Sequence, residues 1–275
     1  MKSFSLFAIP ILFLFSCATA PHREAVIGVS YGTLKAPYVD ATIFGEKRNF
    51  VFDSGSDRPF IKVLPAAVKE KDLITKGGLI TVNGLDEGVK AFDADIQFGN
   101  TKFPSIIASY SPRYRSESIS LNAILSDRMI FDFQNNKIIL GQKADFCEAT
   151  EPFKIDRELF FVQVKMNRQS VWLLWDTGSE TSFLKDSWAK ENKLLPYLMT
   201  EAKLNAPTLS KKKSMDFYKM KATVGNRTVP FEFAGITFDE SLNMFFSALE
   251  GAIGYDFIKN RRWYFDLNEK RYCFE

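Results

Sequence analysis

Apolar and polar residues alternate in two stretches of the chain that lie far apart. The first stretch, residues 38–53, follows a partial period of two, breaks at a polar turn over residues 45–48 and ends in Asp53. The second stretch, residues 161–176, repeats this order and ends in Asp176; in both, the Asp follows the opening aromatic residue by 15 positions. A period of two is typical of β-strands. We therefore expect two equivalent β-hairpins, each ending in an Asp.

The two halves of the chain also close alike. Residues 123–127 (Ala-Ile-Leu-Ser-Asp) precede a Phe-Asp pair at 131–132, and residues 252–256 (Ala-Ile-Gly-Tyr-Asp) precede another at 265–266. Motifs that recur in the same order indicate a duplicated unit. A polar linker over residues 142–153 separates the copies. The predicted lobes are residues 27–146 and residues 147–275.

A further hairpin is predicted between the repeated motifs of the first half. Alternating runs at residues 79–82 and 89–98 flank a polar, Gly-bearing tip over residues 83–88. Short helices are expected only at residues 64–71 and 185–192. Because few other stretches have a helical period, the predicted fold class is all-β.

The N-terminus has the pattern of a bacterial lipoprotein signal peptide, residues 1–17. Lys2 supplies the positive charge, and the apolar stretch that follows is too short to cross a bilayer. The stretch ends in Leu-Phe-Ser-Cys, which resembles a lipobox and predicts a lipid on Cys17, with residues 18–26 as a tether. The absence of Asp after Cys17 favours the outer membrane of the cell envelope, on either face. An ordinary secretory signal, cleaved near Ala20, is the alternative.

Composition excludes several kinds of chemistry. The formal net charge is +3, from 36 basic and 33 acidic residues, which is too small and too mixed to indicate a nucleic-acid partner. The chain has one histidine, His22, and it precedes the predicted lobes. Ser-His-Asp, Cys-His and most catalytic zinc sites need an imidazole inside the fold. We therefore expect no metal and no cofactor, and the acid–base candidates that remain are carboxylates, lysines and tyrosines.

Two cysteines follow the predicted leader. Cys147 lies where the lobes join, and Cys273 lies in the last predicted strand. An exported chain can keep a disulfide between them. Two unpaired buried thiols are the alternative.

The strongest candidate chemistry lies at the ends of the two matched hairpins, in the segments Phe-Asp-Ser-Gly-Ser (residues 52–56) and Trp-Asp-Thr-Gly-Ser (residues 175–179). One such segment alone is an ordinary turn, because Asp, Ser and Gly are turn residues. Two copies on matched hairpins resemble the aspartic peptidases of the pepsin and retropepsin superfamily. The apolar-apolar-Gly motif at 252–258 adds to this resemblance, which covers residues 27–275.

The resemblance implies two closed, barrel-like β lobes related by a pseudo-twofold axis, with a cleft between them. Asp53 and Asp176 would share one water and one proton, because two adjacent carboxylates cannot both ionise cheaply. One folded monomer would supply both halves of the site, and the partner would be an extended peptide or unfolded protein. The supporting residues would be Ser54, Gly55, Ser56, Thr177, Gly178 and Ser179 in the turns, and Asn83, Gly84, Leu85 and Asp86 in a hairpin that covers the substrate.

Two functions remain open from the sequence. The intact pair of turns favours an aspartic endopeptidase anchored to a bacterial membrane. The first lobe, however, has Ser126 where the second has Gly254, and it is shorter after this point, as if a short helix were lost. This departure favours the alternative, a catalytically inactive lipoprotein that binds peptides or protein partners. In the turns, Ser56 and Ser179 are expected to donate hydrogen bonds to the neighbouring Asp.

Overall fold

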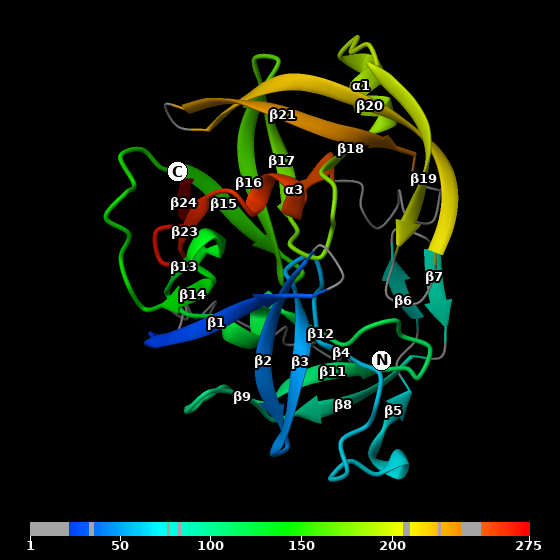
Figure 1. Cartoon of the computed structure of the whole chain (residues 1–275), viewed down its shortest axis with the longest axis vertical. Helices are drawn as coiled ribbons and strands as arrows, with labels where there is room; N and C mark the ends of the chain where they lie inside the picture. Colours follow the sequence, from blue (N-terminus) through cyan, green and yellow to red (C-terminus); the bar gives the residue numbers. More distant parts are fainter. Residues whose placement is uncertain are drawn as a thin grey trace, which may run out of the picture.

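The computed structural model describes residues 22–32, 36–75, 78–81, 84–87, 89–205, 210–224, 227–237 and 249–275. These residues form two β lobes, one above the other in Figure 1, with a further sheet between them. The α-helices of the described part are short: α1 (Asp186–Glu191) and α3 (Tyr255–Ile258). Neither is long and apolar enough to cross a membrane. The predicted all-β fold class is confirmed.

The first lobe contains β1 (Ala25–Tyr31), β2 (Pro37–Ile43), β3 (Glu46–Asp53), β4 (Phe60–Ile61), β5 (Ile74–Thr75), β6 (Gly78–Thr81), β7 (Gly84–Glu87), β8 (Lys90–Ala94), β9 (Ile96–Phe98), β10 (Thr101–Lys102), β11 (Ile106–Tyr110), β12 (Ser118–Ser120), β13 (Arg128–Asp132) and β14 (Lys137–Leu140), with 3-10 turns η1 (Glu70–Asp72), η2 (Leu121–Ile124) and η3 (Phe133–Asn135). The second lobe contains β15 (Glu151–Asp156), β16 (Leu159–Met166), β17 (Gln169–Trp175), β18 (Phe183–Lys185), α1, β19 (Leu198–Asn205), β20 (Ser210–Val224), β21 (Arg227–Ile236), β22 (Gly251–Ile253), α3, β23 (Arg262–Asp266) and β24 (Arg271–Phe274).

Strand pairing repeats between the lobes. In the first lobe β3 runs parallel to β12, which pairs antiparallel with β4, and β4 runs parallel to β11. In the second lobe β17, β22, β18 and β21 pair in the same senses. The second lobe closes into a barrel, because β20 joins β21 on one side and β16 on the other. The duplication predicted from the sequence is therefore present in the strand pairing.

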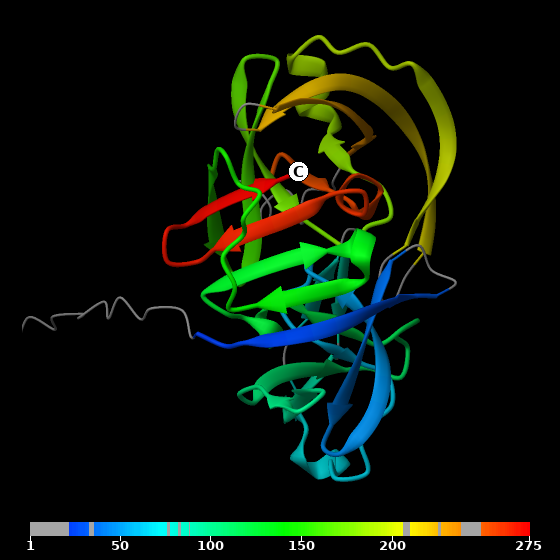
Figure 2. The ribbon, with the colours of Figure 1, turned by 60° about the vertical axis from the view of Figure 1, so that its left-hand side comes forward.

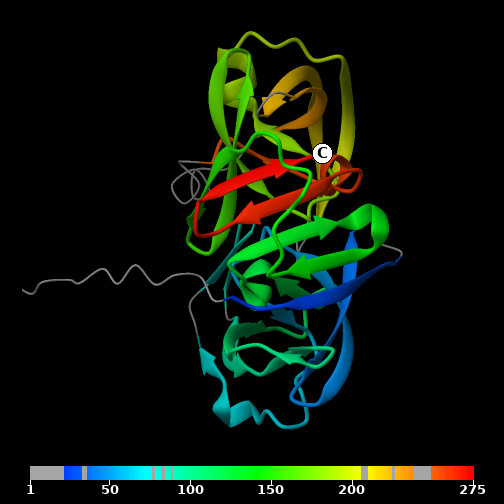
Figure 3. The same cartoon turned by 90° about the vertical axis from the view of Figure 1, so that its left-hand side faces the viewer.

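A six-stranded antiparallel sheet joins the lobes. Its order is β1, β14, β13, β23, β24, β15, and its two central strands come from different lobes. Figures 2 and 3 show these strands between the lobes. The apolar side chains of both lobes belong to one continuous core. At its centre Trp175 packs on Phe131 of the first lobe, with ring centroids 4.7 Å apart. The two lobes consequently form one packed body.

Several local predictions differ from the structure. The expected helix at residues 64–71 is reduced to the turn η1, whereas the one at 185–192 is present as α1. The predicted pairing of residues 79–82 with 89–98 is wrong: β8, in the second of these runs, pairs with β5 and β11. The hairpin is instead formed by β6 and β7, with Thr81 paired to Gly84. Its connection is therefore shorter than the predicted tip: Gly84, Leu85 and Asp86 lie in β7, and Asn83 lies outside the described residues.

The N-terminal segment also differs from the prediction of a free tether up to residue 26. His22 lies against Asp127, with Nδ1 3.0 Å from Oδ1, and the Arg23 amide donates to the Ser126 hydroxyl over 3.1 Å. The strand β1 begins at Ala25. Residues 22–26 thus belong to the folded first lobe, while residues 18–21 lie outside the described part.

Candidate active site

Each candidate Asp stands at the end of a buried strand. Asp53 is the last residue of β3, next to Ser120 of the parallel strand β12. Asp176 follows β17, and its amide donates to the carbonyl of Ile253 in the parallel strand β22 over 2.9 Å. The aromatic residue before each Asp is fully buried, so both strand ends are anchored in the core. The alternation read from the sequence therefore places the two carboxyl groups at equivalent points of the two lobes.

Hydrogen bonds between the two turns link the lobes symmetrically. The Ser54 amide donates to the Thr177 hydroxyl over 3.0 Å, and the Thr177 amide donates to the Ser54 hydroxyl over 2.9 Å. The Ser54 hydroxyl donates to the Trp175 carbonyl over 2.7 Å, and the Thr177 hydroxyl to the Phe52 carbonyl over 2.6 Å. Ser54 and Thr177 are both completely buried. This network holds each turn against the other lobe.

The glycines of the turns bring the carboxyl groups together. A Cβ atom placed on Gly55 would lie 2.3 Å from the Cγ of Asp176, and one on Gly178 would lie 2.3 Å from Oδ1 of Asp53. Each carboxyl group therefore packs directly on the glycine of the opposite turn. A side chain at either position would displace the opposite carboxyl group, because Cβ contacts this short are essentially never found.

Backbone amides also hold the carboxyl groups in place. Oδ1 of Asp53 accepts from the Gly55 amide over 3.1 Å. Oδ1 of Asp176 accepts from the amides of Gly178, over 2.9 Å, and Ser179, over 3.1 Å. Asp176 thus has the stronger support for a negative charge.

Burial and proximity change the acidity of both groups. Burial, followed by the charge of Asp176, raises the pKa of Asp53 to about 8. Burial also raises the pKa of Asp176, to about 6, and the surrounding amides limit this rise. The proximity of the two carboxyl groups raises the pKa of Asp53 and lowers that of Asp176, which favours a proton on Asp53 and a charge on Asp176. Near neutral pH the pair retains one proton, as in a shared-proton acid–base site.

The predicted hydrogen bond from the second serine to the neighbouring Asp is made in one turn only, by the backbone amide of Ser179. The Ser56 hydroxyl donates to the Arg58 carbonyl over 2.6 Å, and that of Ser179 donates to the Thr181 carbonyl over 2.8 Å. A hydroxyl has one proton to donate, so neither donates to the neighbouring Asp. Both serines instead close the turn that follows the carboxylate.

The strand pairings correct the predicted match of Ser126 to Gly254. β12 pairs with β3 and β4 as β22 pairs with β17 and β18, which places Ser120 at the position of Gly254 and the turn η2 at that of α3. The helix that was expected to be lost is therefore reduced to a 3-10 turn. Ser126 lies beyond it, fully buried, and its hydroxyl donates to the Arg23 carbonyl over 3.0 Å.

Asp57 is a residue near the site that the sequence analysis missed. Its charge adds to the rise in the pKa of Asp53, and its side chain pairs with Arg58. The signal was present, because Asp57 directly follows the first Asp-Ser-Gly-Ser segment. Charged residues after a turn are common, however, and spacing alone does not distinguish this one.

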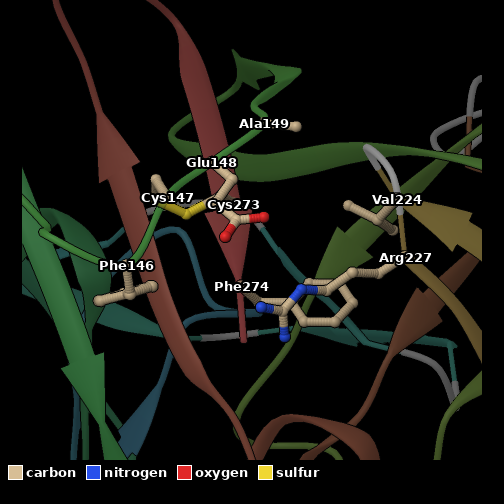
Figure 4. Close-up of a pocket in the computed structure, with 8 residues that line it drawn as sticks. All are labelled: Phe146, Cys147, Glu148, Ala149, Val224, Arg227, Cys273 and Phe274. Carbon is tan, nitrogen blue, oxygen red and sulfur yellow. A yellow bond between two sulfur atoms is a disulfide. The ribbon is translucent and has the colours of Figure 1, made fainter.

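The disulfide lies away from the paired carboxyl groups. Cys147 and Cys273 are bonded, with Cα atoms 5.9 Å apart. Figure 4 shows them at a small cavity that Val224 and Arg227 line from the other side. Within the described ranges, no cluster of three or more His, Cys, Asp or Glu side chains forms a metal site. Cys17 lies outside these ranges.

Comparison with known proteins supports the fold. No protein-family model matches the sequence, and no curated protein matches it either. Among solved structures, the crystal structure of an aspartic proteinase from Irpex lacteus is similar, with a TM-score of 0.58 and 10% sequence identity. The match covers 92% of this chain and 97% of the other. The chain therefore has a pepsin-like aspartic-proteinase fold over nearly its whole length.

Proposed function

We propose that the chain is an aspartic endopeptidase whose dyad is Asp53 and Asp176. The observation that carries this proposal is the reciprocal packing of each carboxyl group on the glycine of the opposite turn. The raised pKa values support it, because they leave one proton on the pair near neutral pH. The similarity to the Irpex lacteus aspartic proteinase supports the same reaction class.

The reaction needs one carboxylate and one carboxylic acid. The ionised partner takes a proton from a water molecule, and the water oxygen bonds to the carbonyl carbon of the peptide. The protonated partner gives its proton to the carbonyl oxygen, which yields a tetrahedral intermediate. Transfer of a proton to the amide nitrogen then allows the carbon–nitrogen bond to break. The pair titrates as a unit, and the amides around Asp176 favour the charge on that residue.

The substrate would be an extended peptide that crosses the dyad between the lobes. A peptide in this conformation binds through its backbone, as an added strand does. The β6–β7 hairpin would cover it. In the view of Figure 1 this hairpin lies at the same edge of the molecule as the lower ends of β19 and β20.

The protein would work at the bacterial envelope. The leader and the Cys-containing motif at its end support export and a lipid on Cys17. The disulfide agrees with an oxidising compartment. Replacement of Cys17 by Ser should abolish incorporation of labelled palmitate and release the protein from the membrane fraction; retention of the label would contradict lipidation at this residue.

Cleavage by the purified protein tests the peptidase proposal. Residues 18–275 should cleave an unfolded protein substrate, and Asp53→Asn or Asp176→Asn should abolish cleavage, as should pepstatin. The matched control is Asp93→Asn, an exposed carboxylate on β8, which should cleave like the wild type. Cleavage that persists in both dyad variants would reject the dyad. Peptide binding without cleavage by the wild type would favour the non-catalytic alternative.

A further inference from the structure

The turn after Asp53 and the turn after Asp176 are bound by different groups. In the second lobe, the helix α3 donates two backbone amides to the turn after Asp176. The Tyr255 amide donates to the Ser179 carbonyl over 2.7 Å, and the Asp256 amide to the Glu180 carbonyl over 3.2 Å. In the first lobe the 3-10 turn η2 stands at the position of α3, because β12 pairs with β3 and β4 as β22 pairs with β17 and β18. The carbonyl that corresponds to that of Glu180 is bound from η2 by a side chain.

A side-chain amide, that of Asn122, takes this place. Asp57 follows Asp53 by four positions, as Glu180 follows Asp176, so their carbonyls are equivalent. Nδ2 of Asn122 donates to the Asp57 carbonyl over 2.5 Å. The amide oxygen of Asn122 accepts from the hydroxyl of Ser120, which is paired with Asp53 in the sheet. Asn122 thus contacts both the strand beside Asp53 and the turn that follows it.

Asn122 also joins this turn to the other lobe. Its Nδ2 donates to Oε2 of Glu158 over 2.6 Å. Glu158 lies in the β15–β16 turn, where Arg157 and Glu158 have positive φ angles of 49° and 66°. Positive φ is unfavourable for residues with a side chain, by roughly 1 kcal/mol each. The backbone of this two-residue turn therefore has few alternative conformations, which fixes the place of the Glu158 carboxylate in the second lobe.

The pseudo-twofold axis does not repeat this link. The strand pairings match Ser120 to Gly254 and therefore Asn122 to Asp256. The Asp256 carboxylate instead accepts from the amide and hydroxyl of Ser182. The donor to the turn carbonyl is thus the Asn122 side chain in the first lobe and the Asp256 backbone amide in the second.

From this asymmetry we infer that Asn122 is a positioning residue of the dyad. Its side-chain amide takes the place of the Asp256 backbone amide at the first turn and, through Glu158, holds Asp53 in register with Asp176. This inference rests on the proposed peptidase function for its kinetic consequence but not for its structural one.

Exchange of donor and acceptor tests the link. Asn122→Asp removes the hydrogen bonds to the Asp57 carbonyl and to Glu158, and kcat should fall at least about tenfold, which is the loss expected from the bond to the charged Glu158 alone, with KM little changed. Glu158→Gln keeps an acceptor, so its kcat should stay within about twofold of the wild-type value. When the two substitutions are combined, the new amide at position 158 can donate to the new carboxylate at position 122, at the wild-type net charge. In this double variant kcat should recover at least threefold over Asn122→Asp. Asn122→Ala should lose activity without rescue by Glu158→Gln.

The matched control is Asn49→Asp. Nδ2 of Asn49 donates to Oδ1 of Asp40 over 2.7 Å on an exposed hairpin of the same lobe, so this variant places an Asp beside a carboxylate far from the turns. It should retain wild-type kcat. Wild-type kcat in both Asn122 variants, or no recovery in the double variant, would overturn the inference.

A measurement without substrate separates this inference from the peptidase proposal. In residues 18–275 the remaining cysteines are bonded to each other, so spin labels can be placed through Lys47→Cys in the first lobe and Arg168→Cys in the second, both exposed. The distance distribution between the labels should broaden with Asn122→Ala and not with Asn49→Asp. An unchanged distribution with Asn122→Ala would reject the link, whether or not the wild type cleaves peptides. If the wild type cleaves nothing, the peptidase proposal fails and the distances alone decide the role of Asn122.

Discussion

At the scale of single residues, Asp53 and Asp176 have unlike surroundings although their segments are nearly identical. Asp176 accepts two hydrogen bonds from the amides of its own turn, whereas Asp53 accepts one and lies near the charge of Asp57. Amide donors stabilise a carboxylate, and a nearby negative charge destabilises it. The repeated sequence motif predicts a pair of carboxyl groups. Which of the two holds the proton depends on these contacts.

The raised pKa values predict activity around neutral pH. Between the lower value of about 6 and the upper value of about 8, the dyad carries the single proton that the reaction needs. Activity should fall in acid, as the second carboxyl group gains a proton, and in alkali, as the pair loses its last one. The pH profile of kcat/KM for purified residues 18–275 measures both limbs. A rate that keeps rising with acidity, far below the lower value, would contradict this prediction.

Gly55→Ala should remove activity while leaving the protein folded. Its new methyl group would overlap the Asp176 carboxyl group and displace it. A displacement of about 1 Å at reacting atoms costs about 100-fold in rate, so we expect at least that loss in kcat. Gly28→Ala is the control, since a Cβ there meets nothing within 4 Å. Wild-type cleavage by Gly55→Ala would show that the carboxyl groups are not held as described.

At the scale of elements, the hairpins that end in the Asp-bearing turns were predictable, and the elements that contact these turns were not. Residues 38–53 and 161–176 alternate locally, and a local pattern determines a hairpin without help from the rest of the chain. The expected helix at 64–71 was wrong apart from η1, because the surrounding sheet overrides a weak helical pattern. Asn122 was not predicted, since its partners lie 65 and 36 residues away in sequence.

The hydrogen bonds between the turns should contribute measurably to stability. Thr177→Val keeps the shape of the side chain but leaves the Ser54 amide and the Phe52 carbonyl without their buried partner. We expect a loss of about 2–4 kcal/mol in the free energy of unfolding, from two unsatisfied buried groups. Thr177→Ser keeps the hydroxyl and should lose only about 1 kcal/mol for the methyl group. Urea denaturation compares the two variants, and equal losses would contradict the assigned role of the hydroxyl.

At the scale of the whole molecule, the lobes are joined by more than the linker. The six-stranded sheet interleaves strands of both halves, with Phe131 paired to Trp263 across the centre. The aromatic core continues from one lobe into the other. The disulfide then ties the end of the chain to the segment between the lobes. Asp53 and Asp176 are consequently set in a single packed body rather than in two mobile ones.

Loss of the disulfide should lower stability without removing activity. The bond closes a loop between residues 126 positions apart, and such a cross-link contributes about 2–4 kcal/mol. Replacement of both cysteines by Ser should lower Tm by roughly 4–16 °C for a chain of this size. Cleavage at low temperature should stay near the wild-type rate, because the bond lies away from the dyad. Addition of a reductant should shift Tm of the wild type and leave that of the double variant unchanged.

The sequence alone determined the duplication, the all-β class and the two Asp-bearing turns, because these depend on local alternation and on short segments that recur at equal spacing. Only the tertiary structure decided which carboxyl group is better suited to carry the charge, whether Cys147 and Cys273 are bonded and how a side chain from η2 contacts the first turn. These features depend on contacts between residues far apart in the chain. Such contacts have no period and no fixed spacing, so they arise only when the two lobes pack.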